Sequence, residues 1–367
     1  MDSNQSSSTQ LPWDYLDKSV SVALTGKAFH HALQMGSQNP FMLNSILAKA
    51  KVYARMSPSD KALLVEALQK NLKIFCGMCG DGANDCGALK TAAVGISLSE
   101  AEASIAAPFT SRVQDIRCVV SLLREGKAAI VTSFQAFKFI ELYSVIQLTS
   151  AVFLYTVGTT IMDMQFLYID LVALVPLAIV QATTGSSDKL TKDMPTATLF
   201  YFPVLLSVIV SIIIQIGTQV FFFLDVRKQP FYGPIDAEDF EFGDATPCYE
   251  GTVLFMVANA QYFMTCLAFS VAWPFRKPWW TNRGFVICII LIVAMEGLIL
   301  FLPHEGEQFY LDWAEFFGMI DFPDDYNYRF WILLGIVVNS IVTVLAEKFI
   351  VNVITKKWDE RNDRIKA

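Results

Sequence analysis

The stretch Cys79-Gly-Asp-Gly-Ala-Asn-Asp85 decides the fold of the N-terminal part of the chain. It follows a short hydrophobic run, Leu72-Lys-Ile-Phe-Cys76, that is typical of a β-strand. An acid placed at the end of such a strand and followed at once by Gly puts a carboxylate at the carboxyl edge of a sheet. Ligands bind at this edge in open α/β sheets. The sequence therefore predicts a ligand site beside Asp81.

Two acids in this stretch favour a magnesium site. Asp81 and Asp85 lie four positions apart across a turn, so both can point toward one Mg²⁺, an ion that prefers hard oxygen ligands and keeps water or phosphate as the others. Asn84 can hydrogen-bond a phosphoryl group or its carrier, and Gly82 allows the backbone to approach closely. A single Asp-Gly pair would favour an Asx-type turn that caps the next helix. The whole run favours a metal and phosphate site.

Lys61 is the second element of the predicted site. The preceding residues predict a helix start, with Ser57 as N-cap, Pro58 at the first helical position and Asp60 as the acid of a capping box. A cation near this start can neutralise the charge of a bound phosphate. By itself Lys61 would be a surface lysine, and its interest comes from its pairing with the Asp81 stretch.

Strand and helix patterns alternate in the first 127 residues, which predicts a parallel sheet covered by helices. The strand candidates are Val20–Leu24, Lys51–Arg55, Leu72–Cys76, Val94–Ser97 and Cys118–Val120. The helix candidates are Gly26–Gln34, Ser57–Gln69 with Leu63, Leu64, Ala67 and Leu68 on its apolar face, and Asp85–Thr91. Cys76 and Cys79 have redox-motif spacing, but a strand position favours a buried core pair.

The rest of the chain has the composition of a membrane protein. Hydrophobic residues make up 54% and charged residues 17%, against about 25% charged in ordinary soluble domains. Residues 128–357 contain six apolar stretches of roughly the 20 residues needed to cross a bilayer. They lie near 130–157, 162–182, 199–224, 251–273, 284–303 and 329–351. The tail, residues 358–367, completes the predicted organisation.

Charges in the loops predict the orientation of the spans. Basic residues lie in one loop and after the last span, at Arg276, Lys277, Arg283, Lys356, Lys357, Arg361 and Arg364. The loop after the fifth span is acidic, with Glu305, Glu307, Asp312, Glu315, Asp321, Asp324 and Asp325. Basic loops stay in the cytosol, so the C-terminus is predicted to be cytosolic. The acidic segment Asp225–Glu250 is interpreted as a solvated lumenal loop, with a cation-attracting surface as the alternative.

Several function classes are excluded by composition. The net charge is −7 and no Lys/Arg cluster stands out, so no nucleic-acid partner is expected. The N-terminus is polar and Ser-rich and does not resemble a secretory signal peptide. Seven scattered cysteines suit a reducing compartment. His30, His31 and His304 lack metal-ligand spacing, so no transition-metal site is expected.

Polar residues inside the predicted spans indicate a substrate path, because an ionisable group at mid-bilayer costs roughly 2.5–3.5 kcal/mol on insertion scales. Asp163, Phe166 and Asp170 are spaced three and four apart, which places them on one helical face. Tyr143 and Gln147 share a face of the preceding span. Carboxylates, aromatic rings and an amide suit an organic polycation. The alternative is polar packing between helices.

Other polar residues in the spans are given structural interpretations. Pro176 frees a backbone carbonyl one turn earlier, an arrangement tolerated where a cavity is lined. Lys138 and Glu141 are one turn apart and can pair near the cytosolic end. Glu296 and Asn339 are interpreted as packing contacts between helices rather than as ligands.

Two blocks of the N-terminal part resemble the phosphorylation domain of P-type ATPases, a branch of the haloacid-dehalogenase-like (HAD-like) phosphotransferases. Gly80–Asp85 matches the hinge motif of that family, and Ala88–Ser97 continues it except at Ala93, where the family usually has Asp. Further motifs are similar to the P5B group. They are Ser99–Ser104, Ala107–Thr110, Phe137–Ser144 and Gln165–Asp170, although the family commonly has Ala in the place of Glu141.

The resemblance implies a partial HAD-like domain followed by an all-α bundle of six transmembrane helices. It implies catalytic roles for Asp81, Asn84, Asp85 and Lys61, with Mg²⁺ held by Asp81 and Asp85, and with Lys61, Gly82 and Asn84 at the phosphate. ATP would be the substrate of the full-length enzyme. The implied activity is export of polyamines from late endosomes or lysosomes to the cytosol, past Tyr143, Gln147, Asp163, Phe166 and Asp170.

The family's nucleophile is the Asp of an Asp-Lys-Thr-Gly-Thr run, which this chain does not contain. Its Asp-Lys pairs, at Asp17, Asp60 and Asp188, are not followed by Thr-Gly. The nucleotide-binding and actuator domains of the family are not found in the chain either. The chain alone is therefore expected to be inactive. Two alternatives remain open: a non-catalytic isoform that regulates or competes with a full-length pump as its partner, and a pump for inorganic cations.

Overall fold

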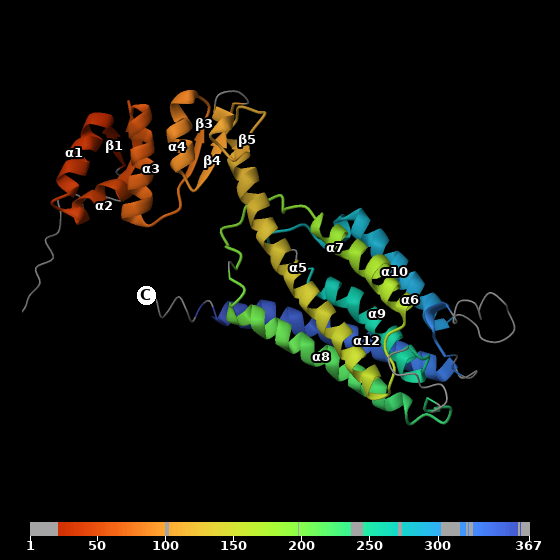
Figure 1. Ribbon diagram of the computed structural model, residues 1–367. Coiled ribbons are helices and arrows are strands. Elements are labelled where there is room, and N and C mark those ends of the chain that lie inside the picture. The colour runs from red at the N-terminus through yellow and green to blue at the C-terminus, as the bar shows by residue number, and fades with distance from the viewer. Residues whose placement is uncertain are drawn as a thin grey trace, which may run out of the picture. The chain divides into compact units, whose positions relative to one another are not determined.

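The computed structural model describes residues 21–99, 103–196, 198–235, 245–270, 274–301, 316–320, 322, 326–358 and 360. The chain divides into two compact units, Met1–Leu122 and Leu123–Ala367. In Figure 1 the first unit runs from red to orange and the second from yellow to blue.

The first unit opens with a parallel strand pair packed against three helices. Its elements are β1 (Val22–Thr25), α1 (Gly26–Gly36), α2 (Pro40–Lys49), β2 (Ala50–Ala54) and α3 (Pro58–Leu72). The helices begin where a side chain accepts a hydrogen bond from the first turn, at Thr25, Asn39 and Ser57, which satisfies a donor that the helix leaves free. The apolar faces meet in a core of Phe29, Ala32, Leu43, Leu47 and Ala67.

A second sheet carries the Asp81 stretch. Strands β3 (Gly77–Gly80), β4 (Val94–Ser97) and β5 (Phe109–Thr110) lie in the order β3-β4-β5 and are parallel. The 3-10 turn η2 (Ala83–Asp85) and helix α4 (Cys86–Thr91) connect β3 to β4. The predicted parallel pairing and the strand at Val94–Ser97 are confirmed. The strands form two small sheets, however, rather than one.

Two predicted strands were wrong. Helix α3 extends through Leu72 and ends at Lys73, which has the left-handed φ of 52°. The following residues lie outside regular structure, with Phe75 96% exposed, and β3 begins only at Gly77. Cys118–Val120 belongs to a helix that starts at Arg117. A three-residue apolar run does not distinguish a strand from a helix start.

The remaining differences in the first unit are smaller. Helix α2 was not predicted, and Leu63, placed on the apolar face of α3, is 36% exposed, whereas Val65 and Ala67 are buried. Cys76 precedes β3 instead of lying within a strand, and both it and Cys79 are half-buried free thiols. Burial raises the pKa of both thiols, so they are mainly protonated at neutral pH. This state suits a structural pair rather than a redox pair.

Among the described residues, six helices are long and apolar enough to cross a membrane, as predicted; apart from the first residues of α5 they belong to the second unit. They are α5 (Arg117–Thr156), the composite helix α6 (Asp163–Leu167), η4 (Tyr168–Leu174) and α7 (Val175–Ala182), α8 (Phe202–Val226), α9 (Tyr249–Ala268), α10 (Arg283–Phe301) and α12 (Tyr326–Phe349) with η6 (Ile350–Thr355). The largest difference from prediction is α5, which begins well before residue 130.

Helix α9 is the centre of this bundle. In its most apolar stretch 78% of the residues are buried, against 28–33% in the corresponding stretches of the other spans. It packs against α8, α10, α12 and η4, as Figure 1 shows. Because α9 touches almost no lipid, its polar side chains must find partners on other helices or remain unpaired.

Successive loops lie at alternate ends of the bundle, and hydrogen bonds join the loops that lie at the same end. At one end, the loop after α7 meets the loop after α9 through Ser187 N–H to Phe275 O at 2.9 Å and Lys277 N–H to Gly185 O at 3.0 Å. At the other end, Thr159 Oγ1 donates to Thr246 O at 2.8 Å. Most of the predicted acidic loop after α10 lies outside the described residues, as does most of the C-terminal tail.

The acidic segment before α9 is partly described. Glu250 is buried, accepts from Tyr232 Oη at 2.7 Å and pairs with Arg227 Nε at 3.1 Å. Its charge is therefore compensated within the protein. Residues 236–244 lie outside the described part of the chain, so the solvated lumenal loop stays a prediction.

The packing of α4 on β4 generates a test. A Cβ added at Gly95 would lie 2.6 Å from the carbonyl oxygen of Leu89, whereas a Cβ added at Gly77 would lie 3.8 Å from that of Val94. We expect Gly95→Ala to destabilise the first unit by about 1–3 kcal/mol through overpacking, and Gly77→Ala to cost much less. Hydrogen–deuterium exchange of the α4 and β4 peptides measures the difference. Equal protection in the two variants would contradict the packing described here.

Candidate functional site

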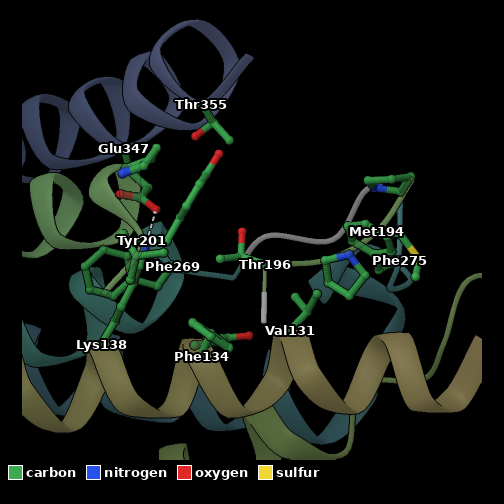
Figure 2. A pocket seen from close by; sticks show the side chains of 15 residues that line it. Val131, Phe134, Lys138, Met194, Thr196, Tyr201, Phe269, Phe275, Glu347 and Thr355 are labelled. Carbon is green, nitrogen blue, oxygen red and sulfur yellow. Dashed lines mark hydrogen bonds and ion pairs between the residues drawn. The ribbon is translucent and has the colours of Figure 1, made fainter. Parts of the chain in front are cut away.

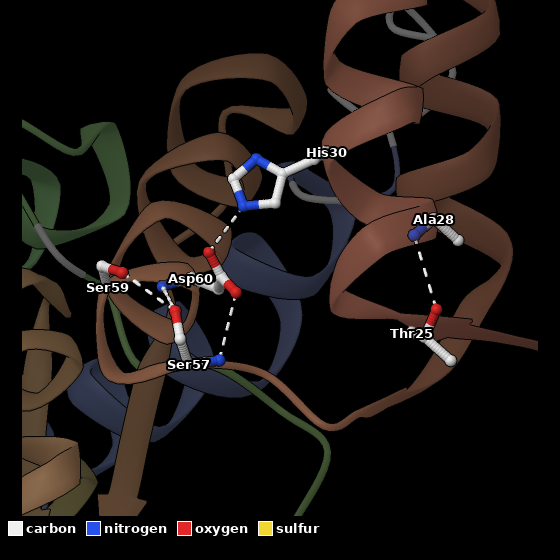
Figure 3. Close-up of polar contacts among 6 residues, drawn as sticks. All are labelled: Thr25, Ala28, His30, Ser57, Ser59 and Asp60. Carbon is white, nitrogen blue, oxygen red and sulfur yellow. Dashed lines mark hydrogen bonds and ion pairs between the residues drawn. The ribbon is translucent and has the colours of Figure 1, made fainter.

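The start of α3 fixes the position of Lys61. Ser57 Oγ accepts from the Asp60 N–H at 3.2 Å, and Asp60 Oδ2 accepts from the Ser57 N–H at 3.1 Å, which closes the predicted capping box. Asp60 Oδ1 also lies 2.7 Å from His30 Nε2 on α1 (Figure 3). The hydrogen bonds from Ser57, and then that from His30, hold the pKa of Asp60 below its usual value. The first turn of α3 is thus anchored from two sides, and Lys61 is the next residue.

Lys61 reaches across to the Asp81 stretch. Its Nζ lies 2.8 Å from Asp85 Oδ1. The Asp85 side chain is 9% exposed and that of Lys61 is 36% exposed, so the pair is open to solvent on the lysine side. The structure therefore brings together two of the predicted site residues in a direct ion pair.

Gly80 makes this arrangement possible. It is the last residue of β3, and a Cβ added there would lie 2.6 Å from Asp85 Cβ and 2.7 Å from Asp85 Oδ2. Only glycine leaves room for the Asp85 side chain to fold back over the end of the strand. Gly80 was not among the predicted site residues, although its place in the stretch Cys79–Asp85 was a signal.

The other residues of the stretch face solvent. Asp81 and Asn84 are exposed, and Gly82 is half-buried in the turn between them. Among the described residues no group of three or more His, Cys, Asp or Glu side chains surrounds one point. Two carboxylates of which one is exposed at the sheet edge do fit Mg²⁺, which takes one or two protein carboxylates and fills its other positions with water and substrate phosphate.

In the second unit, Tyr143 and Asp170 meet. Tyr143 Oη on α5 donates a short hydrogen bond to Asp170 Oδ1. Asp170 lies within η4, a π-helical segment in which the Val175 N–H bonds to Asp170 O. Pro176 follows directly and has no N–H to continue the regular ladder, which explains the wide turn. Such turns within α-helices are frequent at functional sites.

The other residues predicted to line the substrate path are Asp163, Phe166 and Gln147. Asp163 is exposed in the first turn of α6, where a carboxylate also stabilises the helix dipole. Phe166 is 39% exposed. Gln147 is half-buried, and its Nε2 has no hydrogen-bond partner among the described residues. The structure thus joins Tyr143 to Asp170 and places Gln147 beside Tyr143 on the same helix, whereas in its described part it brings no hydrogen bond from Asp163 to this pair.

Lys138 has a different partner from the one predicted. Its Nζ lies 2.8 Å from Glu347 Oε1 on α12 and 2.7 Å from Ser207 Oγ on α8, and Ser207 donates to the second oxygen of Glu347. Glu141 is exposed, so the expected pairing of Lys138 with Glu141 was wrong. Glu141 lies on the exposed side of α5, whereas Lys138 is packed against α8 and α12.

This ion pair forms one wall of a cavity of about 250 Å³, drawn in Figure 2. Phe134, Tyr201, Met194 and Phe269 supply much of its apolar lining, and Lys138 Nζ lies 5.0 Å from the centre of the Phe269 ring. The sequence held a signal for the pair, because Lys138 and Glu347 are opposite charges in two predicted spans. Nothing in the sequence indicated that those two spans touch.

Comparison with known proteins finds relatives that are transport ATPases. The chain is 42% identical over 287 residues to the vacuolar cation-transporting ATPase YPK9 of Saccharomyces cerevisiae, across 78% of this chain and 19% of that protein. It is 37% identical over 362 residues to the probable cation-transporting ATPase 13A4 of Mus musculus, across 93% and 29%. It is 40% identical over 284 residues to the polyamine-transporting ATPase 13A2 of Homo sapiens, across 77% and 24%.

The chain spans less than a third of the length of these curated relatives. No family model matches it.

Replacing Lys61 tests the ion pair at the sheet edge. Lys61→Met leaves the carboxylate of Asp85 without its cation, and we expect a loss of about 1–2 kcal/mol, reduced by solvent on the lysine side. Lys70→Met, at an exposed position in the last turn of the same helix, is the control. Hydrogen–deuterium exchange in α3 and α4 is the measurement, and identical effects of the two substitutions would show that the pair contributes nothing.

Breaking the buried ion pair of Lys138 on α5 and Glu347 on α12 should cost more stability than breaking the pair of Lys61 and Asp85. Lys138→Met leaves Glu347, 2% exposed, without a compensating charge, at an expected cost of about 3–5 kcal/mol. The double variant Lys138→Met/Glu347→Met removes both charges and should recover most of that loss. Thermal unfolding of the purified chain in detergent measures both. A double variant no more stable than the single one would contradict this description.

Proposed function

The chain belongs to the family of P5B-type cation- and polyamine-transporting ATPases, and on this premise we propose that it supplies part of the catalytic domain and six membrane spans of an ATP-driven pump for organic polycations such as polyamines. The observation that carries the proposal is the hydrogen bond from Tyr143 to Asp170 inside the wide turn η4. It holds a carboxylate in the membrane-spanning part of the protein, where such a group needs a functional reason.

We propose that the first unit contributes half of a phosphoryl-transfer site. Asp81 and Asp85 would hold Mg²⁺, which neutralises the charge of the phosphate in an aspartyl-phosphate cycle. Lys61 would add a second positive charge beside Asp85, its partner at 2.8 Å. Gly82 would let the phosphate approach the backbone, and the exposed amide of Asn84 would orient it. ATP would be the substrate of the full-length enzyme, which would also supply the aspartate that is phosphorylated.

The path residues suit an extended polycation better than a metal ion. Asp170 is a single carboxylate bonded to a tyrosine, and Tyr143 lies against Tyr262 with ring centres 5.5 Å apart. Aromatic faces and isolated carboxylates bind ammonium groups through cation–π contact and charge. Divalent metals need several oxygen ligands, and no cluster of three ionisable ligands occurs among the residues described. Gln147, Asp163 and Phe166 would bind further parts of the same substrate.

The chain is a multi-pass membrane protein, and we infer the finer details of its location from the loop charges. Basic loops after α9 and after the last span favour a cytosolic C-terminus. Export toward the cytosol from late endosomes or lysosomes would agree with the name of the vacuolar relative YPK9. A second role, regulation of or competition with a full-length pump, needs no catalysis by this chain and would be seen as co-purification of the two.

Substitutions in the full-length pump test the substrate site. Asp170→Asn should lower the kcat/KM for spermine-stimulated ATP turnover by about tenfold or more, since a charge-assisted contact is lost. Tyr143→Phe should have a smaller effect in the same direction. Ser144→Ala is the control, because Ser144 is exposed and its hydroxyl bonds only to Ile140 O of its own helix at 2.9 Å. Unchanged stimulation in Asp170→Asn, or stimulation by Ca²⁺ in place of spermine, would remove the proposed site.

A further inference from the structure

Glu296 is a buried acid without a partner. Among the described residues, the buried acidic side chains are Asp85, Glu250, Glu296 and Glu347. Asp85, Glu250 and Glu347 each pair with a cation, at distances of 2.8–3.1 Å. Glu296 is 7% exposed, and both of its carboxyl oxygens are buried with no hydrogen-bond partner in the described structure.

Other unpartnered polar atoms lie on the elements around Glu296. Tyr168 on η4 is 6% exposed and electrostatically coupled to Glu296, and its hydroxyl has no hydrogen-bond partner in the part of the chain described. Helix α9, packed against both α10 and η4, carries Asn259, which is 2% exposed with both amide atoms unpartnered. The Tyr168 ring lies 6.0 Å from that of Phe255, one turn before Asn259.

No charged group near Glu296 compensates it. Helix α7 carries no ionisable residue. The ionisable or charged side chains on η4, and on α9 and α12, which pack against α10, are Tyr168, Asp170, Tyr249, Glu250, Tyr262, Cys266, Tyr328, Arg329, Glu347 and Lys348. Of these the cations are committed elsewhere or distant: Arg329 bonds to Leu300 O at 2.8 Å, and Lys348 follows Glu347 at the far end of α12. On α10 itself, Arg283 begins the helix.

An ionised Glu296 would therefore be costly. An unpaired charge taken out of water costs several kcal/mol even after relaxation, whereas a neutral carboxylic acid loses far less. A metal cation would need enough oxygens to replace its hydration shell, and no cluster of ionisable ligands is found among the described residues. A proton needs one oxygen.

We propose that Glu296 is a proton-binding site within the membrane bundle, with Tyr168 as its neutral polar neighbour. The carboxylate takes a proton from the aqueous phase, which forms one O–H bond and cancels its charge. Release of that proton restores the carboxylate when the site opens to water. The earlier interpretation of Glu296 as a packing contact is replaced by this one, while Asn339 does pack, donating to Thr218 Oγ1 at 2.7 Å. The inference does not depend on ATP turnover or on the proposed substrate.

Infrared spectroscopy of the complete 367-residue chain in lipid nanodiscs tests the proposal. At neutral pH we expect a carbonyl-stretch band of a protonated carboxyl that Glu296→Gln removes. Glu125→Gln is the control: Glu125 is exposed and accepts a hydrogen bond from Ser186, so its replacement should leave the band intact. Glu296→Asp keeps the acid and should shift the band rather than abolish it.

A spectrum unchanged by Glu296→Gln would overturn the proposal. So would a melting temperature that rises with NaCl or KCl, relative to choline chloride, in the natural chain but not in Glu296→Gln, since that result would identify a metal cation site. If Glu296→Gln does not fold, the band shift in Glu296→Asp decides: an unshifted band contradicts the assignment to Glu296.

Discussion

The absence of water inside a bilayer is the constraint on which the second unit depends. A polar side chain there needs a partner, and at two places in the described bundle that partner lies on another helix. Lys138 binds Glu347 and Ser207, so one charge ties α5 to α12 and α8. Tyr143 binds Asp170 and ties α5 to η4. Helix α5 is therefore held by polar bonds at two levels along its length.

The same constraint explains why η4 is a suitable place for a substrate. Pro176 has no N–H to donate to the helical hydrogen-bond pattern, and the backbone before it forms the wider π-helical turn that contains Asp170. A widened turn presents its side chain and carbonyl groups differently from a regular helix. The proposed role of Asp170 thus depends on a backbone irregularity next to Pro176 and on the hydrogen bond from Tyr143 to its carboxylate.

Much of the fold could be predicted from the sequence, but the partners could not. Length and apolar composition predicted the six spans, and the glycine-rich stretch from Cys79 to Asp85 predicted the sheet edge. The run Leu72–Cys76 misled because Leu72 is the last residue of α3, and Ile74 and Phe75 after it are exposed instead of lying in a strand. Lys138 was paired with Glu141 by spacing along one helix, although its partner lies 209 positions away. Local patterns report periodicity, whereas contacts between spans depend on how the helices pack.

The most direct measurement concerns the side chain at position 170. In a full-length pump carrying Asp170→Cys, the rate of labelling by a cationic methanethiosulfonate reagent can be compared with and without spermine, with the unsubstituted protein as background. If Asp170 lines the polycation site, spermine should slow the labelling markedly. Equal rates with and without spermine would contradict the assignment of Asp170 to the transport path.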